Sequence, residues 1–155
     1  MKLFVKIGIG ISILSSLCAC REDSDFSEIP ELFYRDFQIS TNEAGRPIAI
    51  WKLGFTDGDG NIGVRDGNEK DSNNFIVSGF QYIDGKITTL PPLQGYRIPA
   101  AENVSTRNGI EGEFRFEFEI DSYISFNIDS MYLEGYVIDR SFNESNSIET
   151  PIFLD

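Results

Sequence analysis

One stretch of the chain, residues 113–121 (EFRFEFEID), constrains the fold more than any other feature. Phe114, Phe116, Phe118 and Ile120 occupy every second position, and every other position is charged. Successive side chains of a β-strand point to opposite faces, so this alternation predicts a strand with one buried face and one solvated face. A strand of this kind belongs in an antiparallel sheet whose apolar face is covered by a second layer.

The rest of the body, by which we mean the chain from residue 33 onward, also favours strands over helices. Short runs with period-two alternation recur between Gly, Asn, Asp and Pro, and no long stretch has a period of 3.6 residues. Further strands are predicted at residues 33–40, 47–55, 75–83, 86–90, 131–138 and 147–154, with a tight hairpin turn at Asp84-Gly85. We therefore expect an all-β protein, an antiparallel immunoglobulin-like β-sandwich, with a small β-barrel as the alternative that periodicity leaves open.

The first twenty residues have the pattern of an export signal. Lys2 and Lys6 precede an apolar run over residues 7–14, which is far shorter than the roughly 20 residues that a membrane-spanning helix needs. The segment Leu17-Cys18-Ala19-Cys20 that follows resembles the lipobox of bacterial lipoproteins. That resemblance implies that residues 1–19 are a lipoprotein signal peptide and that Cys20 becomes the lipidated N-terminus, which anchors the protein to a membrane without spanning it.

An acidic segment comes directly after Cys20. Residues 21–25 (REDSD) resemble the surface-export signal of lipoproteins in the Bacteroidota, which implies an outer-membrane protein that faces the cell exterior. We expect residues 20–33 to form a lipidated acidic tether and residues 34–155 to form the sandwich domain. Without Lys2 and Lys6 the chain has 11 basic and 25 acidic residues, a balance that disfavours nucleic acid and favours cations or basic partners.

The residues of the body exclude the commonest catalytic sites. The chain has no histidine, and both cysteines lie within the first twenty residues, so a thiolate nucleophile, a histidine base and a Cys/His zinc site are absent from the body. We expect no catalytic residues and a non-enzymatic binding or assembly module of the cell envelope. The alternative is an accessory glycan-binding subunit of an outer-membrane importer. A carboxylate-dependent hydrolase is less favoured, because a small sandwich with short loops has little material for a deep cleft.

A glycine-rich acidic loop follows the second predicted strand. In residues 56–63 (TDGDGNIG), Asp57, Asp59 and Asn61 offer oxygens at alternate positions, and the intervening glycines let the backbone curl around a hard cation such as calcium. The segment is not an EF-hand loop, because Ile62 stands where that loop needs glycine. The competing interpretation is a turn whose side chains bind nearby backbone amides.

A second polar loop, residues 139–146 (DRSFNESN), is predicted at the same end of the sandwich. Asp139 would then join Asp57, Asp59 and Asn61 in a candidate calcium site. Three clustered carboxylates repel one another unless a cation or Arg140 neutralises them.

These loops also carry a family resemblance. Residues 55–63 (FTDGDGNIG), 139–146 and 149–151 (ETP) together resemble small Bacteroidota surface lipoproteins of unknown function. The resemblance implies an immunoglobulin-like fold and no particular activity. The chain departs from the family pattern at Asn61, where the family has a third acid, and at Ser141-Phe142.

Three tyrosines fit two arrangements. Tyr82, Tyr132 and Tyr136 could form an exposed aromatic strip for glycan binding or fill the inner face of the second sheet.

Overall fold

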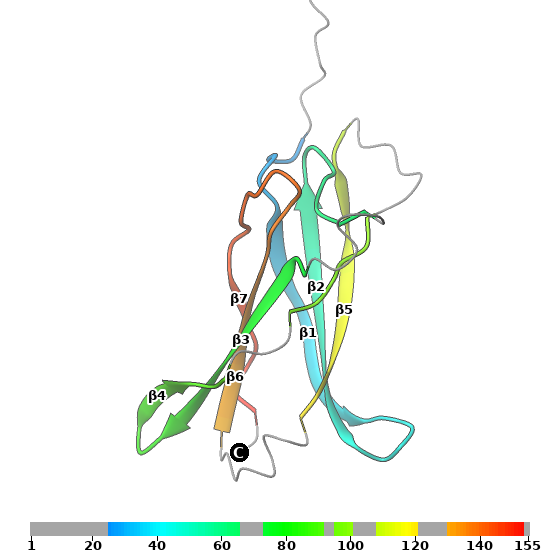
Figure 1. Cartoon of the computed structure of the whole chain (residues 1–155). Helices are drawn as coiled ribbons and strands as arrows, with labels where there is room; N and C mark the ends of the chain where they lie inside the picture. The colour runs from blue at the N-terminus through cyan, green and yellow to red at the C-terminus, as the bar shows by residue number, and fades with distance from the viewer. Residues whose placement is uncertain (1–24, 66–72, 92–94, 101–107, 121–129, 154–155) are drawn as a thin grey trace, which may run out of the picture.

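A computed structural model describes residues 25–65, 73–91, 95–100, 108–120 and 130–153, and these residues form strands and connecting loops (Figure 1). The strands are β1 (Glu31–Thr41), β2 (Pro47–Asp57), β3 (Phe75–Ile83), β4 (Lys86–Thr89), β5 (Ile110–Glu119), β6 (Ser130–Val137) and β7 (Ile148–Glu149). The described part of the chain contains no helix, and so none that could cross a membrane.

The strands form two antiparallel sheets that pack face to face. One sheet has the order β1-β2-β5 and the other β4-β3-β6-β7. The chain changes sheet after β2, after β4 and after β5, in the manner of immunoglobulin-like sandwiches. No described strand of one sheet pairs with a described strand of the other, so the fold is a sandwich and not a closed barrel.

Several strand predictions are confirmed with shifted ends. β3 has the predicted bounds, and Asp84 and Gly85 adopt φ values of 50° and 73°, as a tight hairpin turn requires. β1 begins at Glu31, inside the segment assigned to the tether, and Leu32 is already buried in the core.

The last predicted strand, residues 147–154, is wrong in its extent. The structure has a two-residue β7 and an isolated antiparallel bridge between Met131 and Phe153. Pro151 lies between these two pairings, and its lack of an N–H interrupts the ladder.

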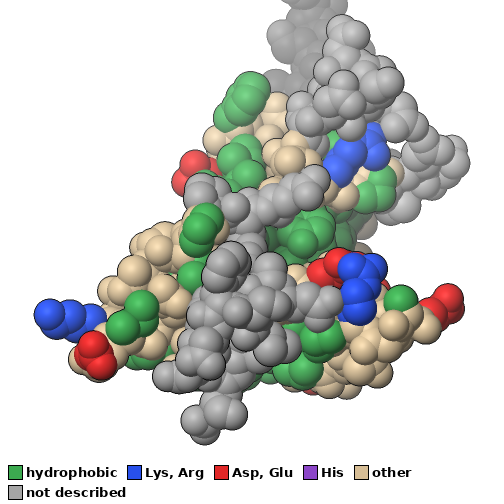
Figure 2. Space-filling model, turned by 60° about the horizontal axis from the view of Figure 1, so that its bottom comes forward, with side chains coloured by type: hydrophobic (Ala, Val, Ile, Leu, Met, Phe, Trp, Pro, Cys, Tyr) green, Lys and Arg blue, Asp and Glu red, His purple; other side chains and the backbone are tan. Residues whose placement is uncertain are grey.

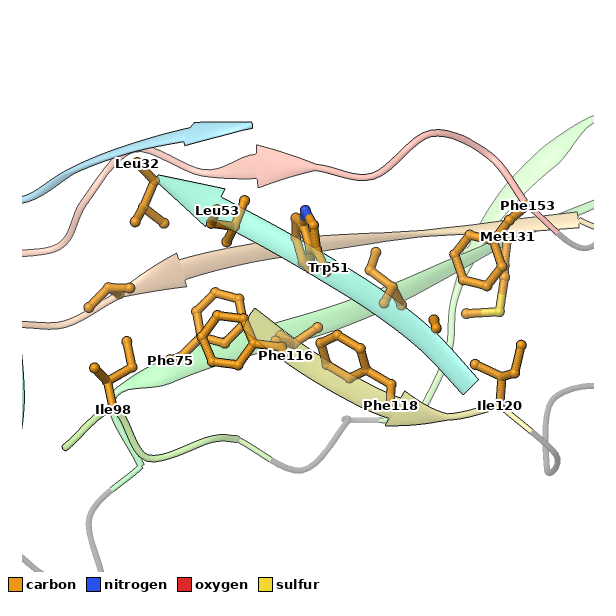
Figure 3. Packing of buried hydrophobic residues seen from close by; sticks show 14 of the residues in the cluster. Leu32, Trp51, Leu53, Phe75, Ile98, Phe116, Phe118, Ile120, Met131 and Phe153 are labelled. Atoms are coloured by element: carbon orange, nitrogen blue, oxygen red, sulfur yellow. The ribbon is translucent and has the colours of Figure 1, made fainter. Parts of the chain in front are cut away.

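The core lies between the sheets and is rich in aromatic rings (Figure 3). Phe116 of β5 stacks on Phe75 of β3 with ring centroids 4.0 Å apart and an interplanar angle of 18°. The fully buried Trp51 of β2 packs against Phe75 at 5.9 Å and against Phe118 at 6.4 Å. The apolar face predicted for residues 113–121 therefore faces inward along β5, where its side chains cover the opposite sheet.

The charged side chains of β5 lie on the solvent face. Glu119 forms an ion pair with Arg46 at 2.8 Å, and Glu117 forms one with Arg115. Both pairs are about half exposed, so each contributes little to stability.

The two faces of β5 should respond differently to substitution. We expect Phe116→Asp to cost more than about 3 kcal/mol of unfolding free energy, because it buries an unpaired charge against Phe75. Glu117→Gln should stay within about 1 kcal/mol of wild type, because it loses one exposed ion pair. Urea denaturation followed by circular dichroism measures both, and equal losses would contradict the assignment of faces.

Candidate functional site

The two polar loops meet at the end of the sandwich where the N-terminal segment enters (Figure 1). The start of β1 pairs with the end of β2 through Glu31 and Thr56. The amide of Gly58 donates to the carbonyl of Ser27 at 2.7 Å, and the amide of Arg140 donates to the carbonyl of Asn61 at 3.3 Å. The loop after β2 therefore contacts both the N-terminal segment and the loop after β6.

Asp57, the last residue of β2, is fully buried. Its Oδ2 atom accepts a hydrogen bond of 2.7 Å from the amide of Ile62, and its carboxyl also lies within hydrogen-bonding reach of the Asp59 carboxyl. Burial raises the pKa of Asp57 to about 6, and the hydrogen bond to Asp59 and that residue's negative charge add to the rise. Backbone hydrogen bonds from Ile62 and Asn61 act in the opposite direction, but they only partly offset this rise in the pKa of Asp57.

Asn61 links Asp59 to the neighbouring loop. Its Nδ2 atom donates to Asp59 Oδ2 at 2.6 Å and to Ser141 Oγ at 3.0 Å. Asp57, Asp59 and Asn61 thus lie in one cluster, and the bond from the Ile62 amide to Asp57 is of the kind that the turn interpretation expects.

Each of these three side chains also has a buried oxygen without a hydrogen-bond donor. Among the described residues, nothing donates to Oδ1 of Asp57, Asp59 or Asn61. A buried acceptor without a partner costs about 1–3 kcal/mol, and more when it is charged. Most buried polar groups in proteins have a hydrogen-bond partner, so three buried oxygens without one within five residues are unusual.

Glycine is required at two points of the loop. A Cβ atom at Gly58 would lie 2.3 Å from the carbonyl oxygen of Phe26, so a side chain there would push the N-terminal segment away. Gly60 has a φ of +68°, in the left-handed region that glycine adopts without strain. The glycine pattern therefore reflects close packing as well as curvature.

Asp139 is buried beside this cluster, but its hydrogen bonds stay within its own loop. Oδ1 accepts from the amides of Ser141 and Asn143 at 2.8 and 2.7 Å, and Oδ2 accepts from Asn143 Nδ2 at 2.8 Å. Ser141, which the sequence reasoning did not select, is the residue of this loop whose side chain bonds to Asn61. The described residues contain no group of three acidic, histidine or cysteine side chains placed to hold a metal, and the four-residue calcium site with Asp139 stays a prediction.

Arg140 does not neutralise the cluster. Its guanidinium donates to the carbonyl of Gly63, and within the described part of the chain it forms no ion pair with Asp57 or Asp59.

Asn74 positions the loops and was also missed by the sequence reasoning. Its Nδ2 donates to the carbonyl of Ile62 at 2.7 Å, and its Oδ1 accepts from the amide of Ile98 at 2.7 Å. Its own carbonyl accepts from Ile138 at 2.8 Å. An asparagine just before a strand was the available signal, but its partners come from three distant segments that no local pattern reveals.

The tyrosines lie on the outer face of the second sheet. Along β3 and β6 the buried residues alternate with less buried ones, and Tyr82, Tyr132 and Tyr136 belong to the outward set. Tyr132 stacks on Phe80 with ring centroids 5.0 Å apart, and Tyr82 packs beside Tyr132 at 6.2 Å. We call Phe80, Tyr82 and Tyr132 the outer aromatic row.

Comparison of the chain with protein families, with curated proteins and with solved structures found no match.

The raised pKa of Asp57 predicts a pH-dependent stability. Between pH 4 and pH 6 the folded state holds a proton on Asp57 that the unfolded state, with a pKa near 3.8, has released. Stability from this group is thus complete below pH 4 and is lost as pH rises through about 6, by about 3 kcal/mol. In a chelating buffer, Asp57→Asn should gain about that much relative to wild type between pH 3.5 and pH 7. Urea denaturation of both proteins across this range measures the difference, and parallel pH profiles would contradict the prediction.

Proposed function

We propose that this protein is a lipid-anchored, non-enzymatic binding or assembly module of the cell envelope, held in the outer membrane through Cys20 and facing the cell exterior. Cys20 lies outside the described residues, so the anchor is argued from the lipobox-like segment, and the resemblance to Bacteroidota surface lipoproteins supports it. β1 begins at Glu31. A linker of about 10 residues reaches at most roughly 35 Å, so the sandwich would stay near the membrane.

The outer aromatic row is the observation that favours binding. Phe80, Tyr82 and Tyr132 stand on the solvent side of a sheet whose other side already covers the core. Ile87, which is 56% exposed, pairs with Tyr82 and extends the row onto β4. Rigid aromatic side chains supply much of the binding energy at protein interfaces.

The outer aromatic row is placed where a partner outside the membrane could reach it. The β3–β4 hairpin lies at the end of the sandwich opposite to the N-terminal segment (Figure 1), and hydrophobic side chains lie on it behind a charged tip (Figure 2). A protein tethered at its N-terminus would therefore point this end of the row away from its anchor.

A glycan is the second candidate partner, as in an accessory subunit of an outer-membrane importer. Tyrosine rings offer an apolar face for a sugar ring and a hydroxyl for its polar rim. Glu134 and Glu149, which pair across β6 and β7, lie next to Tyr132 and would suit sugar hydroxyls or a basic protein surface.

A carboxylate-dependent hydrolase has less support. Asp57 and Asp59 are close enough to share a hydrogen bond, whereas the paired carboxyls of glycosidases stand about 5 Å or more apart. Asp57 is also fully buried, so a substrate has no access to it.

Loss of the lipid should release the protein. We expect Cys20→Ala to abolish incorporation of a fatty-acid analogue and to move the protein out of the detergent phase. Cys18→Ala is the matched control, because Cys18 would be removed with the signal peptide and its loss should leave labelling intact. Unchanged labelling of Cys20→Ala would refute the anchor.

Substitution of the outer aromatic row should separate binding from folding. We expect Tyr82→Ser with Tyr132→Ser to lower retention on immobilised cell-surface glycans, or cross-linking to envelope proteins, at least about tenfold, as loss of two aromatic anchors would. The melting temperature should fall by only a few degrees, because both side chains face solvent. A glycan result favours the importer subunit and a cross-link favours the assembly module, whereas unchanged binding in both assays would contradict the role of the row.

A further inference from the structure

We propose that the loop after β2 binds one calcium ion through side-chain oxygens of Asp57, Asp59 and Asn61, and that this ion fixes the N-terminal segment to the sandwich. The inference goes beyond the proposed binding function and does not depend on the partner of the outer aromatic row.

The loop after β2 contains buried side-chain oxygens of the kind that bind calcium. Asp57 and Asn61 are at least nine-tenths buried, and each has an Oδ1 atom without a donor among the described residues, as does Asp59. Carboxylate and amide oxygens are the ligands that calcium takes, and the loop contributes them at alternate positions within five residues. A cation bound between the two carboxylates would satisfy the free oxygens of Asp57 and Asp59.

The same cluster has negative charge that the nearby cationic side chain does not neutralise. Two adjacent carboxylates lie in this buried cluster, and the neighbouring guanidinium of Arg140 bonds to the carbonyl of Gly63 instead of to either of them. The adjacent loop has directed its own carboxylate, Asp139, to local amides. A divalent ion therefore supplies positive charge where the described residues supply none by an ion pair.

The ligand chemistry selects among metals. The cluster has no sulfur or imidazole, which disfavours zinc and copper. Magnesium demands octahedral geometry and gives up its waters reluctantly, so a buried cluster held by irregular loop backbone suits the flexible coordination of calcium better. Asn61 takes part when its amide turns by half a rotation, so that Oδ1 replaces Nδ2 on the side of Asp59.

The consequence for the N-terminal segment follows from the packing of the loop. Gly58, between two of the ligands, donates its amide to Ser27 and is too close to Phe26 for any side chain. Asn61 reaches Ser141 on the other side. An ion that holds the loop in this curvature also holds its contacts with the N-terminal segment.

Calcium binding is tested on the full chain, purified as cells produce it, in detergent. Equilibrium dialysis with radioactive calcium should give one ion per chain, with a dissociation constant on the order of 10⁻⁴ to 10⁻³ M, as in extracellular modules with few fixed charges. At 10 mM calcium the melting temperature should rise by about 5 °C over chelator. Magnesium at the same concentration and ionic strength should give less than half of that shift. Amide exchange at Gly58 should slow in calcium.

Variants of single residues separate the site from general screening of an acidic chain. Asp57→Asn and Asp59→Asn should lose the stoichiometric ion and the thermal shift, whereas Asp84→Asn, which removes a carboxylate at an exposed turn, should keep both. Asn61→Asp adds a third acid and should tighten binding about tenfold, which keeps the test valid if Asp57→Asn does not fold. Equal thermal shifts in wild type and Asp59→Asn, or no tightening in Asn61→Asp, would overturn the site. Binding without slower exchange at Gly58 would overturn the proposed coupling to the N-terminal segment.

Discussion

The fold depends on the contacts of Phe75. This side chain projects from β3 into the core, stacks on Phe116 of β5 and packs against Trp51 of β2, so it joins its own sheet to two adjacent strands of the other. Gly135 of β6 makes room for it, since a Cβ atom there would lie 2.8 Å from the Phe75 ring and 3.2 Å from Trp51. Close packing of this kind makes the position of one sheet sensitive to single atoms of the other. The contacts of Phe75 therefore set the spacing of the two sheets at this point of the core.

Outside the paired strands, polar side chains supply the hydrogen bonds that backbone groups would otherwise make in a sheet. Asn146 accepts from the amide of Leu32 at 2.8 Å and donates to its carbonyl at 3.0 Å, so a single amide group pairs with β1 as a neighbouring strand would. Asn74 donates to the carbonyl of Ile62 and accepts from the amide of Ile98, and Asp139 accepts from two amides of its own loop. Buried backbone groups must find partners, and short amide and carboxylate side chains supply them where the chain is irregular. The loop after β2 itself joins the N-terminal segment through the bond from the Gly58 amide to the carbonyl of Ser27.

The two ends of the sandwich thus have different properties. The end nearest the N-terminal segment contains buried oxygens that are short of positive partners, whereas the opposite end contains a hairpin with exposed apolar residues. Unsatisfied buried acceptors destabilise the fold, and the calcium ion proposed for the first end would remove that cost. The outer aromatic row extends toward the second end, where an envelope partner would reach it. In these two proposals, the ion would hold the N-terminal segment to the sandwich and the outer aromatic row would contact the partner.

The features that sequence alone determined are the ones that depend on neighbouring residues. Period-two alternation made the faces of β5 predictable, and Asp84-Gly85 made the hairpin turn predictable, because side-chain direction and turn conformation are local properties. Tertiary structure alone decided that Asp139 bonds within its own loop, that Ser141 reaches Asn61, and that the tyrosines face outward. Those outcomes depend on which sheet covers which face and on the competition among donors from distant segments, and neither is encoded in the spacing of residues along the chain.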